Sequence, residues 1–329
     1  MNYKNILASL LSGETLCETG AYELMKQVGE GSLSDIQCTS IITAMSCRAI
    51  SLYELMGFRR ALLELCRPFG EGSIEAIDLC GTGGDGKNSF NISTTASFVV
   101  AASGYRVTKH GNYGVSSITG SSNLLESLGF EFSGDSSVLL KSLDKYNICF
   151  IHAPLFHPAL KNVAHIRKAL GVGTFFNMLG PLVNPAMPNK QLVGVFSLAL
   201  ARMYNYLLQE DNKDYAVVYS LDGYDEVSLT ADFQYLSNNG EDIISPASLG
   251  YPTNTCESIS GGQNVDDAKS IFLNILQNKA TEAQRNVVLA NAGLAIKCFE
   301  QNLSLHECIA KADEALVSGR AYSLFRACL

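Results

Sequence analysis

The first 66 residues carry the apolar spacing of helices. Ser34 is followed three positions later by Gln37, and Ser51 by Glu54, and such pairs form capping boxes at helix N-termini. Apolar residues then recur every three or four positions behind each pair. The pattern predicts a small helical domain over residues 1–68 that contributes no chemistry of its own.

After residue 70 the pattern changes to short apolar runs that alternate with helical segments. Runs that predict strands lie at residues 76–80, 106–108, 148–151, 192–195 and 216–220. Helices are predicted at residues 94–102 and 280–300. Alternation of this kind predicts an α/β domain built on a largely parallel sheet.

Composition narrows the class of partner. The chain has 329 residues, 47% of them hydrophobic, and a net charge of −8. This acidity argues against nucleic acid as a partner, although backbone N–H groups can still bind small phosphorylated ligands. No apolar run is long enough to cross a membrane. The ten cysteines form no C-x-x-C pair, which argues against zinc and fits a reducing cytosol, so we expect a cytoplasmic protein.

A glycine-rich stretch, residues 81–86, follows the first predicted strand directly. Glycines allow backbone N–H groups to approach a ligand closely. Ser89, Asn91, Ser93 and Thr94 then lead into a helix, whose N-terminus suits a phosphate or diphosphate. The stretch matches neither the P-loop nor the dinucleotide pattern. Taken alone, an ordinary glycine turn remains an equal interpretation.

A second polar loop begins at Lys109 and follows the next predicted strand. Its remaining candidate residues are His110, Gly111, Asn112, Ser116, Ser117 and Ser121. A polar surface loop is the alternative. Because parallel α/β sheets collect ligands at the carboxyl ends of their strands, two such loops favour a binding site.

Two further features suggest a cation and a carboxylate ligand. Asp225 and Glu226 follow the predicted strand at 216–220, and Mg²⁺ prefers one or two carboxylates plus substrate phosphate. A solvated turn is the alternative for this pair. Arg167 could bind a carboxylate in a bidentate fork, but it could equally be a helix-surface charge.

Together these segments resemble the anthranilate phosphoribosyltransferase family. The matching strings are GTGGDG (81–86), FNIST (90–94), KHGN (109–112), VSS (115–117), GS (120–121), LLESLG (124–129), FHPALKNVAHIRKALGVGTFFNMLGPLVNPA (156–186) and DEVS (225–228). They span most of residues 78–230. GTGGDG followed by KHGN, both before NPA, is highly specific.

The resemblance implies transfer of a phosphoribosyl group from phosphoribosyl pyrophosphate (PRPP) to anthranilate, in tryptophan biosynthesis. It assigns PRPP to Gly81, Gly84, Asp85, Ser89, Asn91, Ile92, Ser93, Thr94, Lys109, His110, Gly111, Asn112, Ser116, Ser117 and Ser121. It assigns anthranilate to Gly81, Asn112 and Arg167. Two Mg²⁺ ions are implied, one held by Ser93 with Glu226 and one by Asp225 with Glu226.

The resemblance also implies how the chain is organised. The segment at residues 163–185 would return to the helical domain, which leaves 74–162 and 186–329 for the α/β domain. A homodimer would form through the helices. Because the attacking aromatic amine is already neutral at pH 7, no residue is assigned as a general base.

The chain departs from the family at several positions in and near these loops. Arginine is usual where this chain has Tyr113 and Gly173, and aspartate is frequent where it has Asn123. Gly114 and Ile118 also differ from the common choices. We hypothesise that Lys87 supplies part of the missing charge. The alternative functions are a pyrimidine nucleoside phosphorylase, which would not need Asp225 and Glu226, and a non-catalytic nucleic-acid-binding relative, which the net charge disfavours.

Overall fold

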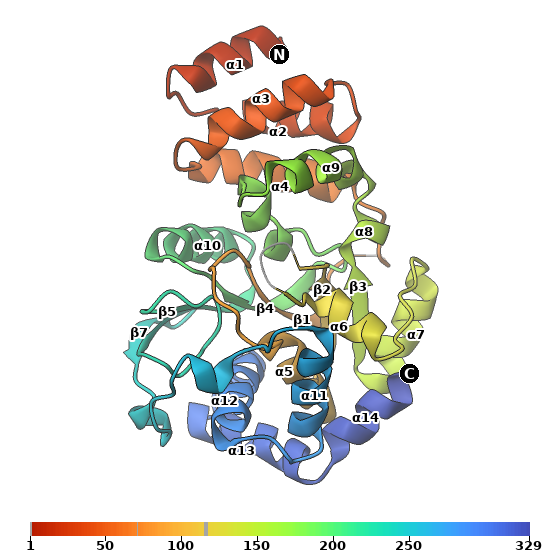
Figure 1. Ribbon diagram of the computed structural model, residues 1–329, viewed down its shortest axis with the longest axis vertical. Helices are drawn as coiled ribbons and strands as arrows, with labels where there is room; N and C mark the ends of the chain where they lie inside the picture. The colour runs from red at the N-terminus through yellow and green to blue at the C-terminus, as the bar shows by residue number, and fades with distance from the viewer. Residues whose placement is uncertain (1, 71, 115–117) are drawn as a thin grey trace. The chain divides into compact units, whose positions relative to one another are not determined.

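The chain folds into two compact units (Figure 1). The computed structural model describes residues 2–70, 72–114 and 118–329. Unit 1 comprises Met1–Phe69 and Ala153–Pro185, and unit 2 comprises Gly70–His152 and Ala186–Leu329. The segment that rejoins unit 1 therefore begins at Ala153, ahead of the predicted start at residue 163.

Unit 1 is helical. Its helices are α1 (Tyr3–Leu11), α2 (Glu18–Gly29), α3 (Asp35–Ser46), α4 (Leu52–Leu65), α8 (Ala153–Phe156) and α9 (Lys161–Leu170). Both predicted capping boxes are confirmed, at the N-termini of α3 and α4. In the second box, the Glu54 carboxylate is fully buried and accepts hydrogen bonds from Arg48, from the Ser51 N–H and from the Leu16 N–H.

Unit 2 is built on one seven-stranded sheet. Its strands are β1 (Ile74–Gly81), β2 (Val107–Gly111), β3 (Ile148–His152), β4 (Pro188–Gly194), β5 (Asp214–Ser220), β6 (Phe233–Ser237) and β7 (Gly240–Ile244). They lie in the order β3-β2-β1-β4-β5-β6-β7. The first five are parallel, and β6 and β7 are antiparallel. The predicted mostly parallel α/β sheet is confirmed.

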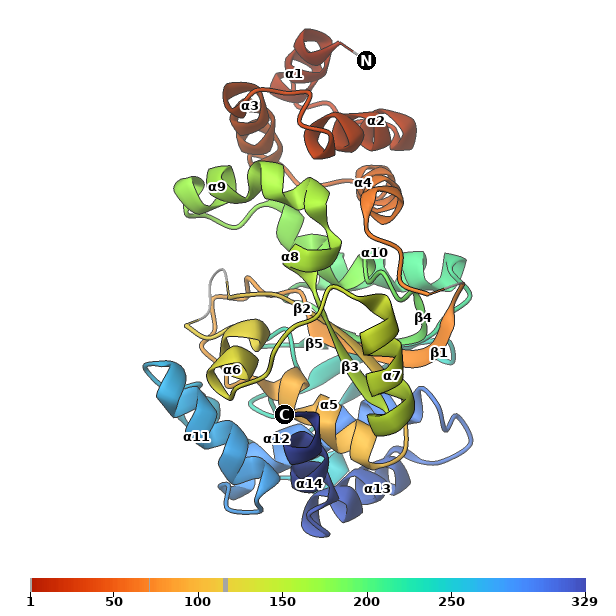
Figure 2. The ribbon, with the colours of Figure 1, turned by 90° about the vertical axis from the view of Figure 1, so that its right-hand side faces the viewer.

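Helices cover both faces of this sheet. They are α5 (Ile92–Ala102), α6 (Ser121–Ser127), α7 (Ser136–Tyr146), α10 (Leu198–Glu210), α11 (Val265–Leu276), α12 (Glu282–Lys297), α13 (Leu305–Val317) and α14 (Arg320–Cys328). Within unit 2, α10 lies on one face, and α5, α12 and α13 lie on the other (Figure 1). Helix α6 packs beside α11 (Figure 2). The core on the α5 side contains Phe98, Phe272 and Phe325.

Two details of the sheet differ from the prediction. Strand β4 starts at Pro188 and ends at Gly194, whereas the apolar run predicted residues 192–195. Its first half is polar and largely buried. The burial of Lys190 is compatible with its charge because its ammonium pairs with the Asp214 carboxylate at 2.7 Å. The β6–β7 hairpin was not predicted, since β7 is largely exposed and lacks an apolar run.

No helix among the described residues combines the length and apolar character that crossing a membrane requires.

Candidate active site

The sheet order brings the predicted loops of unit 2 to one edge. The chain runs from β1 outward to β2 and β3, then returns to the other side of β1 with β4 and β5. Such a reversal leaves a crevice beyond the carboxyl ends of the strands, where open α/β sheets bind ligands. The glycine loop follows β1, the Lys109 loop includes the end of β2, and the carboxylate loop follows β5.

Glycines at the ends of β1 and β4 make room for the carboxylate loop. A Cβ on Gly81 would overlap the Asp225 carboxylate, and a Cβ on Gly194 would overlap the Asp225 backbone. Asp225 is itself buried, and its Oδ2 accepts a hydrogen bond from the Gly83 N–H at 2.5 Å. The Asp225 N–H in turn lies 3.4 Å from Oδ2 of Asp85. The glycine loop and the carboxylate loop are therefore joined directly.

The glycine loop adopts a backbone that few other residues tolerate. Gly83, Gly84 and Gly86 have φ of 69°, 83° and 70°, in the left-handed region. Within the loop, Oδ1 of Asp85 accepts a hydrogen bond from the Lys87 N–H at 2.9 Å. The Lys87 ammonium lies 4.8 Å from the centroid of the Tyr224 ring, on the carboxylate loop.

Glu226, Ser93 and Lys109 form the polar centre of the site. Burial raises the pKa of Glu226 to about 7, against the opposing effects of the Lys109 charge and of hydrogen bonds from Ser93. Lys109 is 2% exposed, and its Nζ donates to the Leu79 carbonyl at 2.5 Å and lies 3.3 Å from the Ser93 hydroxyl. One cation thus faces a carboxylate and a hydroxyl at the N-terminus of α5.

Three acidic side chains, Asp85, Asp225 and Glu226, lie together at this edge. Burial raises the pKa of Asp225 well above its ordinary value, and the Asp85 and Glu226 carboxylates add to the shift. No group of three or more His, Cys, Asp or Glu side chains among the described residues forms a complete metal site. Mg²⁺ needs fewer protein ligands, because substrate phosphate and water complete its shell. The Asp225–Glu226 pair beside Ser93 therefore fits a Mg²⁺ ion that arrives with a phosphorylated substrate.

The other predicted residues of the first loop lie around α5. Ser89 bridges Ser260 in the backbone, and Asn91 precedes the first turn of the helix. Ile92 is 1% exposed and its N–H donates to the Phe90 carbonyl, so its side chain belongs to the core. Thr94 is also buried.

The second loop is held by its own polar residues. The Asn112 carbonyl accepts hydrogen bonds from the Ser121 hydroxyl and the Ser122 N–H, both at 3.2 Å. The Tyr113 hydroxyl donates to Glu126 at 2.7 Å, and its ring meets His152 edge-on. Gly111 ends β2. The predicted residues Ser116 and Ser117 lie outside the described residues.

His110 is buried in the sheet. Its backbone N–H donates to Oδ1 of Asp78, a carboxylate with no exposed surface, at 3.1 Å. This contact ties the backbone of β2 to the Asp78 side chain of the neighbouring strand β1.

Arg167 lies in unit 1, in the last turn of α9. Its guanidinium lies 5.1 Å from the centroid of the Phe176 ring. Burial lowers the pKa of Arg167. No carboxylate within the described parts of the chain forms an ion pair with it. A partly desolvated guanidinium without a carboxylate partner is suited to an anionic ligand.

One residue that anchors the site could not be found by sequence reasoning. Asn291, in the middle of α12, accepts a hydrogen bond from the Val227 N–H at 3.2 Å and donates to the Val227 carbonyl at 2.8 Å. It fixes the backbone directly after Glu226. It lies 64 positions from Val227 in a buried helix, and no local motif signals such a contact.

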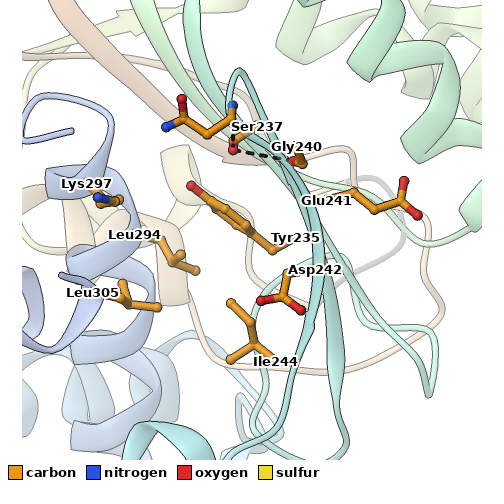
Figure 3. A pocket seen from close by; sticks show the side chains of 10 residues that line it. Tyr235, Ser237, Gly240, Glu241, Asp242, Ile244, Leu294, Lys297 and Leu305 are labelled. Atoms are coloured by element: carbon orange, nitrogen blue, oxygen red, sulfur yellow. Dashed lines mark hydrogen bonds between the residues drawn. The ribbon is translucent and has the colours of Figure 1, made fainter. Parts of the chain in front are cut away.

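Unit 2 also has a pocket away from these loops. A pocket of about 290 Å³ lies between the β6–β7 hairpin and the end of α12 (Figure 3). Tyr235, Leu294 and Lys297 line it, and none of the predicted ligand residues does. The Lys297 ammonium already donates to the Gln301 carbonyl at 2.7 Å. This pocket is therefore separate from the candidate site.

Comparisons with known proteins agree with this geometry. Residues 73–322 match the glycosyl transferase family, a/b domain, and residues 4–66 match the glycosyl transferase family, helical bundle domain. The chain is 51% identical to the anthranilate phosphoribosyltransferase of Christiangramia forsetii over 323 residues, which cover 98% of this chain and 97% of that one.

Two solved structures resemble the fold over almost its full length. Anthranilate phosphoribosyltransferase from Thermus thermophilus has a TM-score of 0.89 and 32% identity, covering 98% of this chain and 97% of that one. The enzyme from Saccharomyces cerevisiae, in complex with PRPP and Mg, has a TM-score of 0.89 and 25% identity, covering 98% and 96%.

Proposed function

The chain belongs to the anthranilate phosphoribosyltransferases, and from this premise we propose how its own residues divide the reaction between them. The enzyme transfers the phosphoribosyl group of PRPP to anthranilate and releases diphosphate, in tryptophan biosynthesis. The nucleoside phosphorylase and nucleic-acid-binding alternatives are not favoured. The assignment of these roles rests on one observation. Ser93, Lys109 and Glu226, which come from three separate segments of unit 2, lie together.

PRPP is proposed to bind across the ends of β1 and β2. Backbone N–H groups of the glycine loop and of the first turn of α5 would hold its phosphates, helped by the positive end of the helix dipole. The Lys109 ammonium, which already faces Ser93, would bind the diphosphate. The predicted ligands in this region remain those assigned from the sequence, except that Ile92 can contribute only its backbone.

Mg²⁺ is proposed to bind as two ions, with Ser93, Asp225 and Glu226 as the protein ligands. The crowding of the Asp85, Asp225 and Glu226 carboxylates supports the proposal, because a divalent cation would relieve their repulsion. When bound, Mg²⁺ neutralises negative charge on the diphosphate. Asp225 has a second role that does not depend on metal, since its Oδ2 orders the glycine loop through Gly83.

Bond cleavage separates charge. As the bond from ribose C1 to the diphosphate oxygen breaks, positive charge develops on the ribose and negative charge on diphosphate. Lys109 and the N–H groups of the glycine loop would stabilise the departing charge from fixed positions. The amine of anthranilate then forms the new bond to C1, and its proton passes to solvent.

Arg167 and Asn112 are proposed to bind anthranilate. A guanidinium matches the two oxygens of a carboxylate, and Arg167 carries no carboxylate partner among the described residues. Because the amine is neutral at pH 7, holding it against C1 accounts for much of the rate without a general base.

A homodimer through the helices of unit 1 is also proposed. Three of the exposed large apolar side chains lie on these helices: Leu11, Ile36 and Tyr53, which are 71%, 79% and 63% exposed. Exposed apolar surface of this kind suits a subunit interface. A cytoplasmic location is proposed as well, since all ten cysteines are free thiols, as expected in a reducing compartment.

The activity is tested by the loss of anthranilate fluorescence on addition of PRPP. We expect turnover with Mg²⁺ and none after chelation with EDTA, restored by excess Mg²⁺. Nicotinic acid and orotic acid, which also carry a ring carboxylate, serve as control acceptors. No consumption of anthranilate under these conditions would contradict the function.

A further inference from the structure

The loop after β2 brings two distant points of its backbone together. A Cβ on Gly120 would overlap the backbone N of Gly114 and would lie 2.6 Å from the carbonyl carbon of Tyr113. Only glycine at position 120 permits this approach. The described ends of the loop are thus in contact just before α6 begins at Ser121.

A single side-chain oxygen joins these two ends. Oδ1 of Asn123 accepts hydrogen bonds from the Gly114 N–H at 3.0 Å and from the Gly120 N–H at 3.1 Å. Asn123 lies in the first turn of α6, three residues after Gly120, so its side chain reaches back over the helix N-terminus. Without this oxygen, both N–H groups would lose their partner.

Gly114 and Gly120, the two residues that Asn123 holds, adjoin residues that are predicted to bind PRPP or that contact such residues. The Asn112 carbonyl is tied to Ser121 and Ser122 at the start of α6. From the other loop, Asn91 donates through Nδ2 to the Thr119 carbonyl at 2.9 Å. Displacing Gly114 from Gly120 would therefore shift residues that are predicted to bind PRPP.

We propose that Asn123 is a positioning residue for PRPP, acting through the backbone of this loop. This inference rests on the proposed PRPP site and adds to it a residue that does not touch substrate. Its required property is one acceptor oxygen, because both bonds end on Oδ1. Aspartate at the same position would preserve that acceptor, whereas leucine, of similar size, would remove it.

The test compares Asn123→Leu with Asn123→Asp. Loss of two backbone hydrogen bonds in the leucine variant should raise the KM for PRPP, and the Kd of PRPP with Mg²⁺ measured by calorimetry, about tenfold, with a smaller effect on kcat. The aspartate variant should regain most of this affinity. Gly120→Ala, whose Cβ would push Gly114 away from residue 120, should also raise the Kd of PRPP.

Ser304→Ala is the matched control. Ser304 caps α13, which holds no predicted ligand residue, so this variant loses a helix cap in the same unit while keeping the loop. It should lower Tm comparably and leave the Kd of PRPP unchanged. An equal loss of affinity in Ser304→Ala would mean that general destabilisation explains the effect, and the proposal would be wrong.

Lys109→Met separates failure of this proposal from failure of the proposed site. If Lys109→Met raises the Kd of PRPP and Asn123→Leu does not, the positioning role of Asn123 is wrong, but the proposed PRPP site is supported. If neither variant weakens PRPP, the site itself is misplaced. An aspartate variant as weak as the leucine variant also overturns the proposal, because the acceptor would then be irrelevant.

Discussion

Arg167 offers the sharpest test of how the acceptor is held. Arg167→Ala removes a half-buried guanidinium that has an aromatic neighbour, Phe176, and no ion-pair partner in the described chain. Loss of charge-assisted bonds to a carboxylate costs about 1.5–3 kcal/mol, which corresponds to roughly a 10- to 150-fold weaker affinity. The whole of this loss should fall on anthranilate, because PRPP is proposed to bind in unit 2.

Steady-state kinetics with each substrate varied in turn measure the effect. The KM for anthranilate should rise by that factor, while the KM for PRPP stays near its original value. Arg167→Lys should give an intermediate result, since lysine keeps the charge and loses the planar fork. Lys168→Ala controls for net charge, because the neighbouring Lys168 is exposed on the same helix. Equal increases in both KM values, or a comparable effect in Lys168→Ala, would refute the carboxylate assignment.

Two further changes separate chemistry from stability. The double variant Asp225→Asn with Glu226→Gln should nearly abolish turnover. Its Tm should not fall, because the amides keep the side-chain shape and remove repulsion with Asp85. Near-normal rates at limiting Mg²⁺ would rule out these residues as metal ligands. In unit 1, burial raises the pKa of Glu54, but hydrogen bonds from Arg48 and from the N–H groups of Leu16 and Ser51 lower it by more. The pKa of Glu54 therefore lies below its ordinary value. A lowered pKa stabilises the fold above the ordinary glutamate pKa of about 4.3, and this stability is lost as pH falls through the folded value. The Tm difference between wild type and Glu54→Gln should therefore shrink below about pH 4, and a constant difference would show that ionisation of Glu54 is not the cause.

Local sequence signals predicted the five parallel strands and several of the helices. The apolar runs at 76–80, 148–151 and 216–220 lie within β1, β3 and β5, because the strands of a parallel sheet are buried on both faces and need apolar residues throughout. The helix predicted at 280–300 corresponds to α12. The hairpin of β6 and β7 escaped prediction, since an exposed edge strand carries no such run.

The contacts within the candidate site were harder to predict than the residues proposed for it. Glycine loops and carboxylates at strand ends are visible in the sequence, but strand order is not, so nothing local places Asp225 against Gly83. The two contacts of Asn123 depend on the close approach of Gly114 to Gly120, which no spacing rule describes. Asn291 could not be predicted either, because its contacts with Val227 depend on how a distant buried helix packs.

The anchoring of Val227 by Asn291 bears on when the enzyme becomes competent during its synthesis. The ribosome delivers the glycine loop, the Lys109 loop and the carboxylates in that order, all before residue 230. The helix that holds the backbone after Glu226 is made later, since α12 spans Glu282–Lys297. A nascent chain that already carries every proposed PRPP and Mg²⁺ ligand of unit 2 therefore lacks the support that sets the carboxylates, and binding should wait until α12 has left the ribosome.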